Sequence, residues 1–174
     1  MGKYILPLQQ DGIYKHICRN GIKKKKSIPF SPYFYKSLTS QVDGKPLGEF
    51  LKLADTSGYC YFYSLLLASG LENAELKYGV LNVLNTNIND CYYEEFGHGW
   101  VEEGSAVYDT TCKQVFNKDW YYKNFEVTVK QSIPTSELVK NEVFEELLVE
   151  SIKERQSLKP LADRILQERN MQNE

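Results

Sequence analysis

The sequence predicts an α+β protein, in which a buried helix is followed by antiparallel strands and then by a helical C-terminal segment. Residues 59–68 (YCYFYSLLLA) are apolar on nearly every side, which is typical of a buried helix. Residues 97–111 (GHGWVEEGSAVYDTT) alternate between apolar and polar positions around a Glu-Gly pair, which indicates a β-hairpin. From Ser136 onward, apolar residues recur every three or four positions, which is the period of an amphipathic helix. This order of elements favours an α+β layout.

The size and composition of the chain are those of one soluble domain. Its 174 residues are enough to bury a sizeable core, and 42% of them are hydrophobic and 25% charged. No apolar run approaches the roughly 20 residues needed to cross a bilayer, and the N-terminus lacks the hydrophobic region of a signal peptide. The four cysteines form no CxxC pair. We therefore expect a cytoplasmic protein with reduced thiols and no membrane partner.

The elements of the N-terminal and central regions follow from local signals. The first fifty residues are rich in proline and glycine turn signals, which predict short strands and turns. Pro46 is well placed to open a short helix, PLGEFLKLA. The buried helix then ends at Gly70, a natural stop signal. Alternation predicts a strand over residues 76–84, and residues 125–129 (FEVTV) predict a further strand after the hairpin.

The C-terminal segment is predicted to be helical. Ser136 is a plausible N-cap, and Pro160 separates the first helix from a shorter one over residues 161–168. We expect an α+β domain over residues 1–134 and a helical extension over residues 135–174, packed on the domain or projecting from it. One apolar stripe could pack within the chain or dock a partner helix, and its members are Leu138, Phe144, Leu148 and Ile152.

The hairpin brings the histidine at position 98 close to an acidic residue. With a loop centred on residues 103–104, His98 faces Asp109, whereas a three-residue loop would place Thr110 there instead. Directly opposed residues have Cβ atoms about 4.5–5.5 Å apart, so the carboxylate would reach the imidazole. Such a pair either bonds the sheet together or fixes the imidazole for catalysis, as in catalytic triads.

Three large side chains are candidates for the surroundings of this pair. With a period of two, Trp100 and Val107 share the face of the histidine and would form an apolar wall. Tyr59, directly before the buried helix, is the third candidate for a wall or substrate-binding residue.

Cys60 has a setting that the other cysteines lack. It stands at the predicted start of the buried helix, with Ser57 as the expected N-cap. Free backbone N–H groups and the helix dipole favour a thiolate in the first turn, and Gly58 would let the side chain face outward. The alternative is a small core residue. Cys18, Cys91 and Cys112 lie in loops or polar surroundings.

A cysteine at a helix start, followed by His-x-Trp-Val-Glu and by Tyr-Asp-x-Thr, resembles the transglutaminase-like branch of the papain-like cysteine enzymes. The matching pieces are Gly58–Cys60, His98–Glu102 and Val107–Thr111. They span less than half of the chain. The resemblance implies a helix bearing the cysteine, packed on an antiparallel sheet bearing the histidine and the aspartate. It also implies that Cys60 is the nucleophile, His98 the base and then the acid, and Asp109 the orienting group.

The implied activity is that of a cysteine protease, amidase or acyltransferase, acting on peptide or isopeptide amides through an acyl-enzyme. Neither a cofactor nor a metal ion is implied, since no calcium-site signature is present. The backbone N–H of Cys60 is one oxyanion donor by position. A papain-like glutamine shortly before the cysteine is missing from residues 55–59 (DTSGY), which leaves the distant Gln41 as a candidate.

Other interpretations remain open. Cys91, His98 and Cys112, with or without Cys60, could gather around zinc, although their spacings match no standard structural pattern. The chain could also be a catalytically inactive module of the same fold that acts through protein–protein interaction. The run Lys23–Lys26 could contact phosphate, but without interleaved arginine or aromatic residues it specifies little, so nucleic acid is not an expected partner.

Overall fold

The computed structural model describes residues 41–56, 58–87, 90–111 and 113–173, and it confirms the α+β architecture. The strands are β1 (Gln41–Val42), β2 (Lys45–Pro46), β3 (Glu75–Asn87), β4 (Asp90–Glu103), β5 (Ala106–Asp109), β6 (Gln114–Asn117) and β7 (Thr128–Pro134). The helices are α1 (Leu47–Leu53), α2 (Cys60–Ser69), α3 (Lys118–Phe125), α4 (Thr135–Leu138), α5 (Asn141–Ile152), the 3-10 helix η2 (Gln156–Leu158) and α6 (Lys159–Gln172). Predictions for Cys18 and the run Lys23–Lys26 lie outside the described residues.

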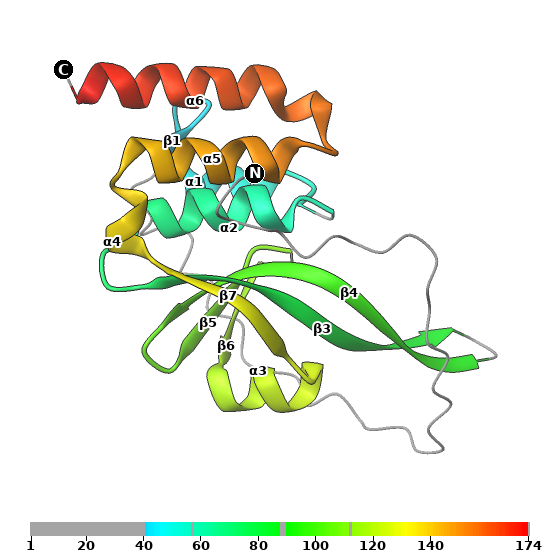
Figure 1. Cartoon of the computed structure of the whole chain (residues 1–174). Helices are drawn as coiled ribbons and strands as arrows, with labels where there is room; N and C mark the ends of the chain where they lie inside the picture. The colour runs from blue at the N-terminus through cyan, green and yellow to red at the C-terminus, as the bar shows by residue number, and fades with distance from the viewer. Residues whose placement is uncertain (1–40, 57, 88–89, 112, 174) are drawn as a thin grey trace.

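The described part of the chain is layered, with helices on both faces of one sheet (Figure 1). Five antiparallel strands are arranged in the order β6-β5-β4-β3-β7, and β1 and β2 form a separate short pair. Helices α2, α5 and α6 are stacked on one side of the sheet, and α3 lies on the other side (Figure 1). The long hairpin of β3 and β4 forms the centre of the sheet. Near α2, helices cover both faces of these two strands (Figure 1).

Each face of the sheet has its own hydrophobic cluster. Tyr78 and Val101 pack with the helices α2 and α5 on one face. Trp100 and Val107 pack with Tyr121 of α3 on the other. Alternate residues of a strand point to opposite faces, which is why the neighbours on β4 belong to different clusters. The sheet therefore separates two cores, and residues at its edges are the ones that can connect them.

Helix α2 is buried on nearly every side, as its composition predicts. Its N-cap residue is Tyr59, whose side chain forms no capping hydrogen bond, and Ser57, the expected N-cap, lies outside the described residues. The helix ends at Gly70, as predicted. Strand β4 passes close beneath α2. A Cβ atom on Gly99 would lie only 2.7 Å from the hydroxyl oxygen of Ser64, which is too close for a side chain. The glycine lets α2 approach the strand that carries His98.

The C-terminal segment consists of more helices than the sequence predicts. The expected single helix is divided into α4 and α5, whose N-cap residues are Pro134 and Lys140, so Ser136 is not a cap. Thr135 anchors α4 to the chain before β3, since its hydroxyl donates to the carbonyl oxygen of Glu72 at 2.7 Å. Pro160 is the second residue of α6, which is longer than predicted. The stripe Leu138, Phe144, Leu148 and Ile152 is buried and packs within the chain.

The predicted strand over residues 125–129 is only partly present. Phe125 ends α3, and β7 begins at Thr128. The side chain of Asn117 accepts a hydrogen bond from the backbone N–H of Trp120 at 3.1 Å, which caps the start of α3. Glu126 ends the helix in the left-handed conformation, with φ 45°. The alternation of residues 125–129 therefore reflects a helix end and the start of an edge strand.

Candidate active site

The hairpin of β4 and β5 has a different register from the predicted one. Its loop is Gly104-Ser105, and Val101 pairs with Tyr108. Gly104 has φ +57° at the first loop position, where a type II′ turn requires glycine. Extending this register places Asp109 opposite Trp100, so the predicted direct pairing of Asp109 with His98 is wrong. Because each partner moves by two residues, the histidine and the aspartate stay on the same face.

The two side chains meet diagonally across the hairpin. The Nε2 atom of His98 lies 3.0 Å from the Oδ2 atom of Asp109. Diagonal neighbours in a sheet remain within reach of long side chains. Both residues are almost inaccessible to solvent, with exposed fractions of 3% for His98 and 2% for Asp109. The imidazole–carboxylate contact expected from the sequence is present, in a shielded environment that strengthens it.

Cys60 completes the cluster from a separate element. It is the first residue of α2, and its exposed fraction is 8%, so the thiol faces inward rather than outward. The thiol lies beside the imidazole of His98, because hydrogen bonding and charge interaction with Cys60 contribute to the raised pKa of His98. Because Asp109 occupies Nε2, Nδ1 is the ring nitrogen left for the thiol. The structure thus brings together the three side chains that the sequence singles out.

A contact between loops brings the start of α2 to this place. The hydroxyl of Thr56 donates a hydrogen bond of 2.8 Å to the carbonyl oxygen of Thr110. This bond joins the segment before α2 to the end of β5. Pairing between β4 and β5 extends only from Val101 to Glu103. The start of α2 therefore lies at the end of the short strand β5, beside the stretch of β4 that carries His98.

The charge state of His98 depends on its two partners. Burial alone would lower the pKa of His98, but the charges and hydrogen bonds of Asp109 and Cys60 outweigh it and raise the pKa to about 10. The imidazole then keeps its proton at neutral pH. A positively charged imidazolium beside a cysteine is one of the settings that favour a thiolate nucleophile.

The three wall candidates have different positions. Trp100 and Val107 are fully buried. The indole of Trp100 stacks on the imidazole of His98, with ring centroids 6.2 Å apart and planes 16° apart. These two residues back the imidazole and have no exposed surface with which to contact a substrate. Tyr59 is partly exposed directly before Cys60, where it can contact one.

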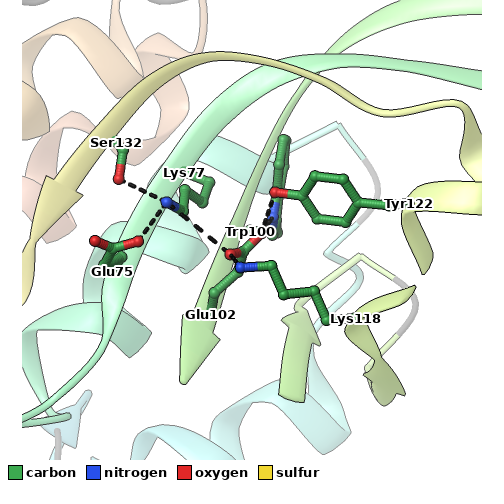
Figure 2. Close-up of polar contacts among 7 residues, drawn as sticks. All are labelled: Glu75, Lys77, Trp100, Glu102, Lys118, Tyr122 and Ser132. Carbon is green, nitrogen blue, oxygen red and sulfur yellow. Dashed lines mark hydrogen bonds and ion pairs between the residues drawn. The ribbon is translucent and has the colours of Figure 1, made fainter. Parts of the chain in front are cut away.

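A buried carboxylate fixes the indole in turn (Figure 2). Glu102 accepts a hydrogen bond of 2.9 Å from Nε1 of Trp100 and another from the hydroxyl of Tyr122. The ammonium of Lys118 lies 2.6 Å from its second oxygen. Burial would raise the pKa of Glu102, but these donors outweigh it and hold the pKa below its ordinary value. The polar contacts around this carboxylate connect seven residues in Figure 2, namely Glu75, Lys77, Trp100, Glu102, Lys118, Tyr122 and Ser132.

The C-terminal extension also contacts the site. Nε of Arg155, just after α5, donates a hydrogen bond of 3.1 Å to the carbonyl oxygen of Gly58. Its guanidinium lies 5.7 Å from the ring centroid of Tyr59. Gly58 has φ +77°, a conformation that favours glycine. Arg155 thus holds the two residues that lead into Cys60, although 97 positions separate it from Gly58 in the sequence.

We expect Arg155→Ala to slow the alkylation of Cys60 by iodoacetamide several-fold, about 3-fold to 10-fold, because the segment before the thiol loses a hydrogen bond and a stacking partner. Mass spectrometry of the labelled peptides would measure the rate. Arg164→Ala is the matched control, since Arg164 forms an exposed ion pair with Asp43. Equal rates in the two variants would show that Arg155 has no influence on the thiol.

Sequence reasoning missed Tyr121, Glu102 and Arg155. Only Glu102 stood in a recognised motif, and nothing in the sequence indicated that its carboxylate would be buried. Gln41, the candidate second oxyanion donor, lies exposed in β1, and its assignment stays a prediction.

The zinc interpretation involves residues of which only some are described. Cys112 and the side chain of Cys91 lie outside the described part, and the backbone of Cys91 belongs to β4, so its predicted place in a loop is wrong. Among the residues that the structure does describe, no three His, Cys, Asp or Glu side chains are placed to hold a metal ion. Within the same ranges, no helix has both the length and the apolar character needed to cross a bilayer.

Comparisons with protein-family models, curated proteins and solved structures found no match. The functional conclusion therefore depends on the geometry of the cluster and on the resemblance of its motifs.

Proposed function

We propose that this protein is a cysteine-dependent hydrolase or acyltransferase that acts on peptide or isopeptide amide bonds. The observation that carries the proposal is the cluster of Cys60, His98 and Asp109 from α2, β4 and β5, in which the imidazole contacts the carboxylate at 3.0 Å and interacts with the thiol. The two neighbours of this buried imidazole are a carboxylate and a thiol, which is the combination that nucleophilic catalysis by cysteine uses. The same three residues are those that the transglutaminase-like resemblance selects.

The proposed reaction has two halves. The sulfur of Cys60 attacks the amide carbonyl carbon, and the imidazolium of His98 gives its proton to the leaving amine as the C–N bond breaks. The product is a thioester on Cys60. His98, now neutral, then takes a proton from water or from an acceptor amine, which attacks the thioester carbon. Collapse of that intermediate breaks the C–S bond and restores the thiolate and the imidazolium.

Stabilisation of the oxyanion depends on the start of α2. The first N–H groups of a helix have no intrahelical partner and carry the positive end of its dipole. The backbone N–H of Cys60 is among them, because the first intrahelical bond, from Tyr63 to the carbonyl of Tyr59, comes later. It is therefore the donor that we assign to the oxyanion. Cys60 is a free thiol, and a reducing compartment such as the cytoplasm would keep it so.

We expect iodoacetamide at neutral pH to alkylate Cys60 at least about 10-fold faster than Cys91 or Cys112, because Cys60 has an imidazolium partner. Digestion and mass spectrometry at a series of times would give the three rates within one sample. Each cysteine thus serves as an internal control for the others. Equal rates would contradict the proposal and favour the alternative of an inactive binding module of the same fold.

A further inference from the structure

The carboxylate of Asp109 accepts more hydrogen bonds than orientation of a histidine requires. Oδ2, the oxygen that contacts His98, also accepts a hydrogen bond of 2.7 Å from the hydroxyl of Tyr121. The backbone N–H of Thr111 donates to the other oxygen, Oδ1, at 2.9 Å. Tyr121 is fully buried and comes from α3, on the face of the sheet opposite to α2. The carboxylate is thus held from three directions, and one of the donors belongs to a separate helix.

The ring of Tyr121 is itself held in place by aromatic neighbours. Its centroid lies 4.8 Å from that of Phe125 in an edge-on arrangement and 5.2 Å from that of Phe116. Trp100, which stacks on His98, is 6.1 Å away. Contacts of this kind restrict a ring to one orientation. The hydroxyl of Tyr121 therefore has a fixed direction, toward Asp109.

We infer that Tyr121 is a positioning residue of the proposed reaction, whose hydroxyl stabilises the charged form of Asp109 and fixes the oxygen that faces His98. This inference rests on the proposed function. A buried carboxylate is costly unless hydrogen bonds satisfy it, and hydrogen bonds to the charged form favour that form. Without the hydroxyl, the carboxylate competes more strongly for the proton on Nε2. The imidazolium is then held less firmly beside Cys60, and its support for the thiolate is weaker.

The variant Tyr121→Phe removes the hydroxyl and keeps the ring. We expect it to lower the rate of Cys60 alkylation at neutral pH by about 10-fold, the size of effect expected from the loss of one hydrogen bond to a charged group. The midpoint of the rate against pH should also move to higher pH, a change that a purely structural role would not produce. Tyr108→Phe is the matched control, because the hydroxyl of Tyr108, next to Asp109 in β5, donates to Glu103. The control should keep the rate and the midpoint of the unaltered protein.

A double-variant cycle separates coupling from general damage. If Tyr121 acts through Asp109, Tyr121→Phe should cause no further loss in an Asp109→Asn background. An unchanged rate and midpoint in folded Tyr121→Phe protein, a midpoint that falls, or fully additive losses would each overturn the inference. These outcomes leave the proposed function intact, provided that Cys60 of the unaltered protein still reacts faster than Cys91 and Cys112. Thermal unfolding in parallel would show that each variant is folded at the assay temperature.

Discussion

Replacing His98 with alanine is expected to lower the rate of Cys60 alkylation at neutral pH by at least about 100-fold and to abolish amide turnover. The imidazole is the only described side chain that joins the thiol to the buried carboxylate. Removing it takes away the positive charge that favours the thiolate and the group that protonates the leaving amine. Cys60→Ala should abolish turnover to the same extent, and the double variant should be no worse, because nucleophile and base act as one unit.

The chain provides its own control for this experiment. His16 is the only other histidine, and His16→Ala should keep the alkylation rate of the unaltered protein. Rates would be measured by mass spectrometry of peptides that contain Cys60, and turnover with fluorogenic peptide amides. Full reactivity of Cys60 in His98→Ala protein would show that the imidazole does not activate the thiol, and turnover by Cys60→Ala protein would end the proposal.

The same histidine gives a pH dependence of known sign. Its pKa of about 10 in the folded protein lies above the ordinary value of 6.5. A group with a raised folded pKa contributes stability that is complete below the unfolded value and is lost as the pH rises through the folded value. The free energy of unfolding should therefore fall between pH 6.5 and about 10. Urea titrations of the unaltered and His98→Ala proteins at several pH values would show this decline, which the variant should largely lack.

Replacing Gly79 with alanine is expected to destabilise the fold by about 3 kcal/mol or more, because the added methyl group has no room. Its Cβ atom would lie 2.3 Å from the backbone carbonyl oxygen of Thr128 and 2.8 Å from the indole of Trp100. The pairing of β3 with β7 is irregular between Tyr78 and Gly79, so the strands approach each other closely there. On the side of Thr128, the contact can be relieved by a shift of the β7 backbone. Such a shift costs more free energy than a change of side-chain rotamer.

The matched control for this substitution is Gly104→Ala. Gly104 has no atom within 4 Å of an added Cβ, but its positive φ imposes a strain of about 1 kcal/mol. Urea denaturation of both variants would give the two losses of stability. Gly79 pairs directly with His98 across β3 and β4, so slower alkylation of Cys60 should accompany the larger loss. Equal losses in the two variants would show that the close contact relaxes without cost.

Much of the site could be predicted because its signals are local. The position of Cys60 in a first turn follows from the glycine and the apolar run around it. His98 and Asp109 share a face in the predicted and in the observed register, because these two registers differ by an even number of residues. The predicted register is wrong, because the Glu-Gly pair predicts a loop at residues 103–104, whereas the positive φ of Gly104 places the loop at Gly104-Ser105.

The rest of the site depends on tertiary packing. Tyr121 reaches Asp109 only because α3 docks on the sheet with its aromatic residues inward, and the sequence of α3 did not indicate a helix there. Its one local signal was the cap at Asn117, before the run DWYY. The contact of Arg155 with Gly58 joins positions far apart in the sequence, and no periodicity encodes it. Local patterns therefore identified the reacting groups, and the groups that hold them emerged only from the fold.

The sheet divides the molecule into two cores, and the proposed nucleophile and base belong to different ones. Cys60 is the first residue of α2, which packs in the helical stack, whereas His98 stacks on Trp100 of the aromatic cluster around α3. A small displacement of one layer relative to the other would separate the sulfur of Cys60 from the imidazole of His98 and leave both hydrophobic cores intact. The protein would then be folded but would lack an activated thiol.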